Sequence, residues 1–244
     1  MRLIYSSLMA SSLLFGYYGK VEPYQTYNIK SDVSGKIIDV NKSSEATNYK
    51  GIVIKIDKYQ NKIDLKNLET QLKNYESILK SQQKILNKKY KTYQIYKTLQ
   101  TKSELDKDLK FYDYQNSIIV LNQTKNTISN LKAQIAKLKD TISKKSIGFK
   151  NYIYKIDVNK GDYVTPSMPL AVTMDINKVK IDIYVPINEI DGIKTKKIYI
   201  NDKLSNFKIS KIYKVADSKY VTSYKVEIVG KYPKISDIVK VEFK

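Results

Sequence analysis

Rows of apolar residues recur every seven positions in the middle of the chain. One row is Leu65, Leu72, Leu79, Leu86 and Tyr93, and its companion, three residues later each time, is Leu68, Tyr75, Gln82, Lys89 and Tyr96. Further along, Leu121, Ile128, Ile135 and Ile142 form another row, accompanied by Leu131 and Leu138. This spacing is typical of the a and d positions of a coiled coil. Residues 58–146 also contain neither Pro nor Gly, so the whole segment is predicted to be helical.

A helix start is predicted inside this segment. Ser103 followed by Glu104, Leu105 and Asp106 has the form of a helix N-cap with an acidic first turn. Two arms of nearly equal length, about 58–100 and 103–146, are therefore expected to form an antiparallel hairpin roughly 65 Å long. Around Tyr112 to Ile119 the register is unclear, which predicts a stutter in the heptad pattern.

The segments that flank the helical region repeat each other. The residues Ile38-Asp39-Val40-Asn41-Lys42 recur as Ile156-Asp157-Val158-Asn159-Lys160, and the match continues without gaps to the pair Asp57 and Asp175. Each copy reads as strand, turn and strand, and a unit of this size cannot bury its own apolar face. The two copies are therefore expected to pack on each other at the root of the hairpin.

After Asp175 the apolar residues alternate with polar ones. Val179, Ile181, Ile183 and Val185 begin this pattern, and short alternating runs separated by turn residues continue it to Phe243. Such runs predict a small antiparallel β-barrel or sandwich over residues 176–244.

Composition narrows the possible chemistry. The 244 residues include no Cys, His or Trp, which excludes disulfides, Cys/His zinc sites and His-based catalysis. The formal charge of +20 fits a nucleic-acid binder, but Arg2 is the only Arg, and Arg is the preferred reader of phosphate and guanine. A solvated lysine surface is the better explanation, and neither a catalytic residue nor a cofactor is expected.

The first residues have the pattern of an export signal. Met1 and Arg2 provide a short positive region, and the stretch from Leu3 to Tyr18 is apolar or small. Residues 1–19 are interpreted as a signal peptide or, alternatively, an uncleaved N-terminal anchor.

The order of these features resembles that of the membrane fusion proteins, or periplasmic adaptor subunits, of the HlyD family. Residues 33–37 look like the opening of the family's first lipoyl half, and residues 51–57 like the apolar run that precedes its hairpin. Residues 158–170 look like the second lipoyl half, and residues 179–189 like the entry to its barrel. The implied fold is a mixed one: a split lipoyl-like (barrel-sandwich hybrid) β domain, residues 27–57 and 147–175, with an inserted coiled-coil hairpin, 58–146, followed by a β-barrel, 176–244.

The resemblance also implies a role and partners. It implies a non-catalytic adaptor, periplasmic and associated with the inner membrane, that links an inner-membrane transporter of the ABC or proton-driven type to a TolC-type outer-membrane channel in efflux or secretion. Self-association into a ring is implied as well. The hairpin tip of relatives that dock on such channels carries Arg, Leu and Ser. The expected contact residues here are Lys97, Leu99, Lys102, Ser103 and Leu105.

Three other interpretations remain open, and a basic DNA- or RNA-associated coiled coil is one of them. A lipoyl or biotinyl carrier would use Lys58, although the first residue of a long helix is a poor place for a swinging arm. The carboxylates Asp57, Asp175, Glu189 and Asp191 are read as turn and strand-end residues rather than a catalytic pair. An exported structural coiled coil without a transporter partner is the remaining alternative.

Overall fold

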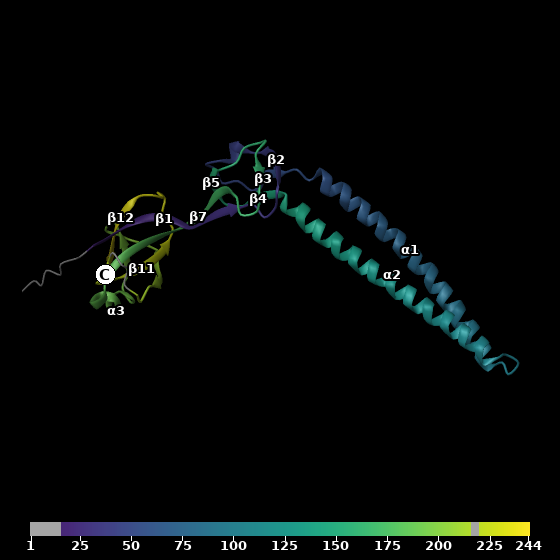
Figure 1. Ribbon diagram of the computed structural model, residues 1–244. Coiled ribbons are helices and arrows are strands. Elements are labelled where there is room, and N and C mark those ends of the chain that lie inside the picture. The colour runs from purple at the N-terminus through teal and green to yellow at the C-terminus, as the bar shows by residue number, and fades with distance from the viewer. Residues whose placement is uncertain (1–15, 216–219) are drawn as a thin grey trace, which may run out of the picture.

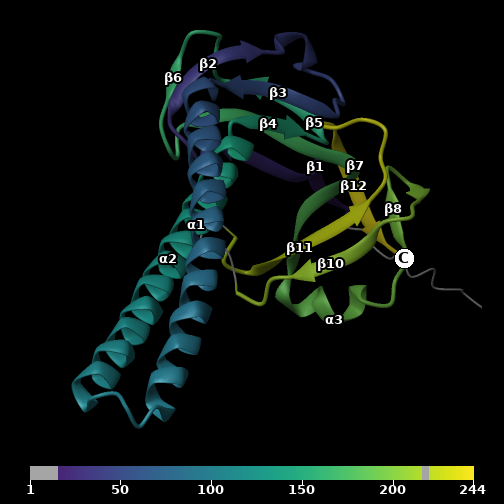
Figure 2. The ribbon, with the colours of Figure 1, turned by 90° about the vertical axis from the view of Figure 1, so that its right-hand side faces the viewer.

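The computed structural model describes residues 16–215 and 220–244, so the predicted export signal lies mostly outside the described residues. Three parts follow one another in space: a β-barrel at one end, a β-sandwich in the middle and a long helical hairpin (Figure 1). Figure 2 shows the same parts from the side, with the two helices running side by side. Within the described residues, no helix combines the length and the apolar character needed to cross a bilayer.

Seventeen elements make up the described part of the chain. The first eight are β1 (Tyr17–Lys30), β2 (Gly35–Val40), the 3-10 turn η1 (Lys42–Ser44), β3 (Gly51–Ile56), α1 (Tyr59–Thr98), α2 (Glu104–Lys144), β4 (Ser146–Phe149) and β5 (Tyr152–Ile156). The others are β6 (Tyr163–Val164), β7 (Pro169–Pro186), η2 (Ile187–Glu189), α3 (Ile190–Ile193), β8 (Ile198–Ile200), β9 (Lys203–Leu204), β10 (Lys208–Ile212), β11 (Ser223–Gly230) and β12 (Ile238–Phe243).

The two repeat copies form the sandwich, as the sequence predicts. Each copy hydrogen-bonds to the first strand of the other: Gly35 in β2 pairs with Val164, while the Ala46 N–H donates to the carbonyl of Ile153. One core then fills the space between the copies and includes residues from both. Its buried members are Ile37, Val53, Ile54, Ile56, Phe149, Ile153, Ile156, Val158, Val164, Leu170 and Ala171. Burial of this shared core holds the hairpin root closed, since neither copy has a core alone.

The turn of the first copy contains Ser44 and Glu45, and side chains beside it contact the other copy. A Glu45 carboxylate oxygen accepts from the backbone N–H of Ile156 at 3.0 Å, and the Lys42 ammonium donates to the carbonyl of the same residue at 2.8 Å. Both backbone groups of Ile156 are therefore satisfied by side chains of the other copy.

A second core fills the barrel. All four alternating residues predicted to face inward from β7, which are Val179, Ile181, Ile183 and Val185, are buried in it. The strands follow the order β10-β11-β7-β1-β12-β8-β9, with β5 added to β7 on the sandwich side. The predicted mixed fold, with its sandwich, inserted hairpin and terminal barrel, is confirmed.

Two long strands connect the barrel to the sandwich. The expected division between residues 175 and 176 lies in the middle of β7, which contributes to both parts. The sequence pattern did not predict β1, whose residues 17–20 pair with β12 and whose later residues pair with β7. The pattern was hidden because the apolar residues at 17 and 18 were read as the end of the export signal.

Candidate functional site

The helical hairpin contains the predicted contact site, and its two arms meet along a regular seam. All ten residues of the two rows predicted on the first arm are partly buried in α1. On α2 the buried and partly buried seam positions alternate in steps of four and three: Lys110, Tyr114, Ser117, Leu121, Thr124, Ile128, Leu131, Ile135, Leu138 and Ile142. This alternation is an unbroken heptad, so the predicted stutter was wrong.

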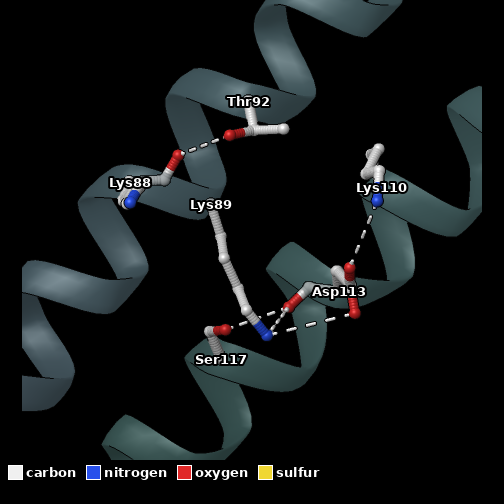
Figure 3. Close-up of polar contacts among 6 residues, drawn as sticks. All are labelled: Lys88, Lys89, Thr92, Lys110, Asp113 and Ser117. Carbon is white, nitrogen blue, oxygen red and sulfur yellow. Dashed lines mark hydrogen bonds and ion pairs between the residues drawn. The ribbon is translucent and has the colours of Figure 1, made fainter.

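The middle of the seam is polar. Gln82 and Lys89 of α1 face this region, and the Lys89 ammonium reaches α2, where it lies 3.4 Å from the carbonyl of Asp113 and 4.0 Å from its carboxylate (Figure 3). The Ser117 hydroxyl donates to the same carbonyl at 2.9 Å, and Lys110 lies 3.9 Å from the Asp113 carboxylate. Polar residues at seam positions fix the register of two helices at a cost in stability.

An aromatic cluster overlaps this polar segment and continues toward the tip. The rings of Tyr93 and Tyr114 stack across the seam with centroids 6.0 Å apart, and Phe111 and Tyr90 pack beside them. Nearer the tip, the Tyr96 ring receives two ammonium groups: Lys102 at 5.5 Å and Lys110 at 5.6 Å from its centroid. The heptad rows place Tyr75, Tyr93 and Tyr96 in the seam, and all three are partly buried there, whereas Tyr90 is exposed.

A second apolar stripe runs along the outside of α2. Leu105, Leu109, Tyr112 and Ile119 follow helical spacing of four, three and seven residues, and each is between 53% and 70% exposed. None of them occupies a seam position. This stripe explains the failed stutter prediction, because its apolar residues were mistaken for an interrupted seam. A helix with two apolar faces, one of them uncovered, is suited to pack against another helix.

The structure brings the five predicted contact residues together at the tip. Lys97 lies in the last turn of α1, Leu99 ends that helix, and Lys102 and Ser103 belong to the connecting loop. Ser103 is the N-cap of α2, as predicted: its hydroxyl accepts from the Asp106 N–H at 3.2 Å. Leu105 begins the outer stripe. Leu109 and Tyr112 were not among the predicted contact residues, although their spacing i, i+4, i+7 from Leu105 is present in the sequence.

The residues of the alternative interpretations have local structural roles. The Lys58 ammonium donates to the Ser146 hydroxyl at 3.0 Å and thus ties the two ends of the hairpin together. Asp57 accepts from the Tyr59 N–H, and Asp175 from the Asn177 N–H, as residues do at a helix start or turn. Asp191 pairs with Lys194 at 2.8 Å, and Glu189 accepts from the Tyr17 hydroxyl. These four carboxylates belong to separate local contacts.

Comparison with solved structures identifies the fold. The chain superposes on MacA from Actinobacillus actinomycetemcomitans with a TM-score of 0.74 at 15% identity, covering 94% of this chain and 78% of that one. The fold is that of membrane fusion proteins. The membrane fusion protein Spr0693 from Streptococcus pneumoniae R6 has a TM-score of 0.59 at 9% identity, with 94% of this chain and 98% of that one covered.

A third similar structure is a putative efflux transporter from Bacteroides eggerthii. It has a TM-score of 0.61 at 14% identity and covers 95% of this chain and 68% of that one. No protein-family model matches the sequence, and no curated protein matches it. At these identities the similarity establishes the fold, and the fold expected from the sequence motifs is confirmed.

Proposed function

We propose that this protein is a non-catalytic adaptor of the bacterial cell envelope, which bridges an inner-membrane transporter and an outer-membrane channel in efflux or secretion. The transporter is of the ABC or proton-driven type, the channel is TolC-like, and several copies associate in a ring around their axis. Localisation is periplasmic, at the inner membrane. Membrane fusion proteins that share the fold support this assignment.

The observation that carries the proposal is the uncovered apolar stripe beside the tip. An arm of 40 residues extends roughly 60 Å. The tip of the hairpin therefore lies at the end of the molecule opposite the barrel (Figure 1), and Leu105, Leu109 and Tyr112 lie in the first turns of α2, beside this tip. A free-standing coiled coil has no use for a second apolar face, since its seam is already filled. The stripe therefore favours a helical partner at the tip.

Crosslinking in cells tests this role. A photoreactive amino acid in place of Lys102 is expected to capture an outer-membrane channel, because this residue lies in the tip loop. The same substitution at Lys62, which is exposed in the first turns of α1, serves as the matched control and is expected to capture none. Crosslinks from Lys102 that contain only this chain or soluble proteins would contradict the adaptor role and favour the structural coiled coil.

The position of β1 adds a constraint on processing. Tyr17 pairs with Val241, and its ring contacts Phe243 with centroids 6.0 Å apart. Removal of residues through Gly19 would delete most of the β1–β12 pairing. We therefore expect the mature chain to retain Tyr17, either because cleavage occurs before it or because the segment stays as an anchor. Mass measurement of the N-terminal peptide from the envelope fraction tests this, and a mature chain starting at Lys20 would refute it.

A further inference from the structure

The end of the barrel farthest from the hairpin brings together the start of β1, exposed apolar residues and lysines that form no ion pair with the described residues. Figure 1 shows α3 and the C-terminus at this end. The strands β7 and β11 reach it together, since Pro186 pairs with Ser223 and the Ile187 N–H donates to the carbonyl of Thr222. The backbones of Lys197 and Lys244 bond to each other here as well. We call this surface, formed by Ile187, Lys196, Lys197, Lys214, Val215 and Val221, the barrel end face.

The chain enters the barrel at this face. The Tyr17 hydroxyl donates to the Glu189 carboxylate at 2.5 Å, beside α3, so the first described strand is fixed there. Only Gly16 separates Tyr17 from residues 3–15, which contain no charged side chain. A membrane-inserted N-terminal segment would therefore hold this end of the barrel close to the bilayer surface.

At this face the carboxylates pair with some lysines and leave other lysines without an ion pair among the described residues. Asp191 pairs with Lys194 at 2.8 Å, and Glu242 pairs with Lys244 at 2.6 Å. Over residues 16–215 and 220–244, Lys196, Lys197 and Lys214 have no carboxylate within ion-pair distance. Val215 is 82% and Val221 is 68% exposed. Lysines among exposed aliphatic side chains are typical of surfaces that rest on anionic lipid headgroups.

We propose that the barrel end face binds the anionic phospholipid surface of the membrane, as a second attachment besides the N-terminal segment. This inference rests on the proposed function in so far as it takes the chain to work at the inner membrane. A single weak anchor gives reversible attachment, and a polybasic surface added to it makes attachment stable. The same contact would fix the orientation of the barrel and so point the hairpin away from the bilayer.

The barrel also offers a matched control at its other end. A groove of about 1100 Å³ there is lined by five lysines that form no ion pair with the described residues, among them Lys178, Lys208 and Lys231. These three lie beside the last residues of β11, and the eight residues of this strand place them roughly 25 Å from its other end, at the barrel end face. This separation is more than two Debye lengths at physiological salt. If net charge alone directed lipid binding, the groove would be preferred.

Binding of the purified full chain to vesicles distinguishes the two surfaces. The vesicles contain phosphatidylcholine alone or phosphatidylcholine mixed with phosphatidylglycerol. One variant changes Lys196, Lys197 and Lys214 to Gln, and the control variant changes Lys178, Lys208 and Lys231 to Gln, so that both lose the same charge. Circular dichroism verifies that both variants fold.

The end-face variant is expected to lose affinity for the anionic vesicles by a factor on the order of 100, at about fivefold per lysine. The groove variant is expected to lose far less, and all three proteins should bind neutral vesicles alike. Equal losses in the two variants, a larger loss in the groove variant, or binding independent of phosphatidylglycerol would overturn the proposal. Because the assay contains neither transporter nor channel, its failure is separate from failure of the adaptor role.

Discussion

Replacing Gln82 with Leu should stabilise the middle of the hairpin. Gln82 occupies a seam position, and its side-chain oxygen is buried with no hydrogen-bond partner among the described residues. It also lines a small cavity of about 190 Å³ together with Ile85, Ser117 and Val120. A buried acceptor without a partner costs about 1–3 kcal/mol, and Leu removes this cost while it adds apolar contact.

Hydrogen exchange followed by mass spectrometry measures the effect where it occurs. Local opening of the helical hairpin sets the exchange rate of its amides. A gain in local stability of this size should therefore slow exchange around residue 82 roughly 5- to 100-fold. Gln83→Leu is the control, since Gln83 is exposed and its amide bonds to Asn87 on the same helix. It should leave the rates nearly unchanged. Unaltered or faster exchange in the Gln82 variant would refute the reasoning.

Three further predictions concern other parts of the chain. Ile128→Ala should lower the free energy of unfolding of the helical hairpin by about 2–4 kcal/mol, because Ile128 is buried in the seam. Urea titration followed by circular dichroism measures this, and an unchanged urea midpoint would show that the seam is wrongly placed. Ser103→Ala should cost about 1 kcal/mol and speed exchange of the Asp106 amide, whereas Ser103→Asp should preserve both; equal behaviour of the two variants would argue against the cap. The ammonium groups of Lys240 and Lys244 hold the pKa of the Glu242 carboxyl below its ordinary value of 4.5. The ionised carboxylate therefore stabilises the fold at pH values above 4.5, and this stabilisation is lost as the pH falls through the lowered pKa. The difference in melting temperature between the native chain and Glu242→Gln should accordingly be constant near neutral pH and shrink below about 4.5; a difference that grows on acidification would contradict this.

The parts of the fold that depend on local periodicity were predictable. The helical arms follow from the heptad rows, and the helix start at Glu104 follows from Ser103 and the acids after it. The sandwich follows from the repeat, because two incomplete copies need each other's apolar faces. Each of these signals lies within a few residues along the chain or in a direct self-match.

The parts that depend on distant pairing were not predictable in the same way. The strand that begins at Tyr17 is defined by its partner Val241, more than two hundred residues away, and its own sequence reads equally well as part of a signal. On α2, two apolar faces share one helix, and a one-dimensional pattern cannot assign each residue to its face. The contact residues at the tip depend on an unknown partner, so the sequence locates the surface without identifying what binds it.

The long strands β1 and β7 have a mechanical consequence. They form a two-stranded ribbon that passes from one core to the other, and their register shifts between Pro23 and Gln25, at the passage between the cores. A bulge of this kind bends and twists a ribbon locally, while the paired backbone resists stretching. A tilt of the barrel would thus reach the base of the helical hairpin as a rotation rather than as a change in length. At 1.5 Å per helical residue the hairpin is roughly 60 Å long, so a small rotation at its base moves the tip through a wide arc.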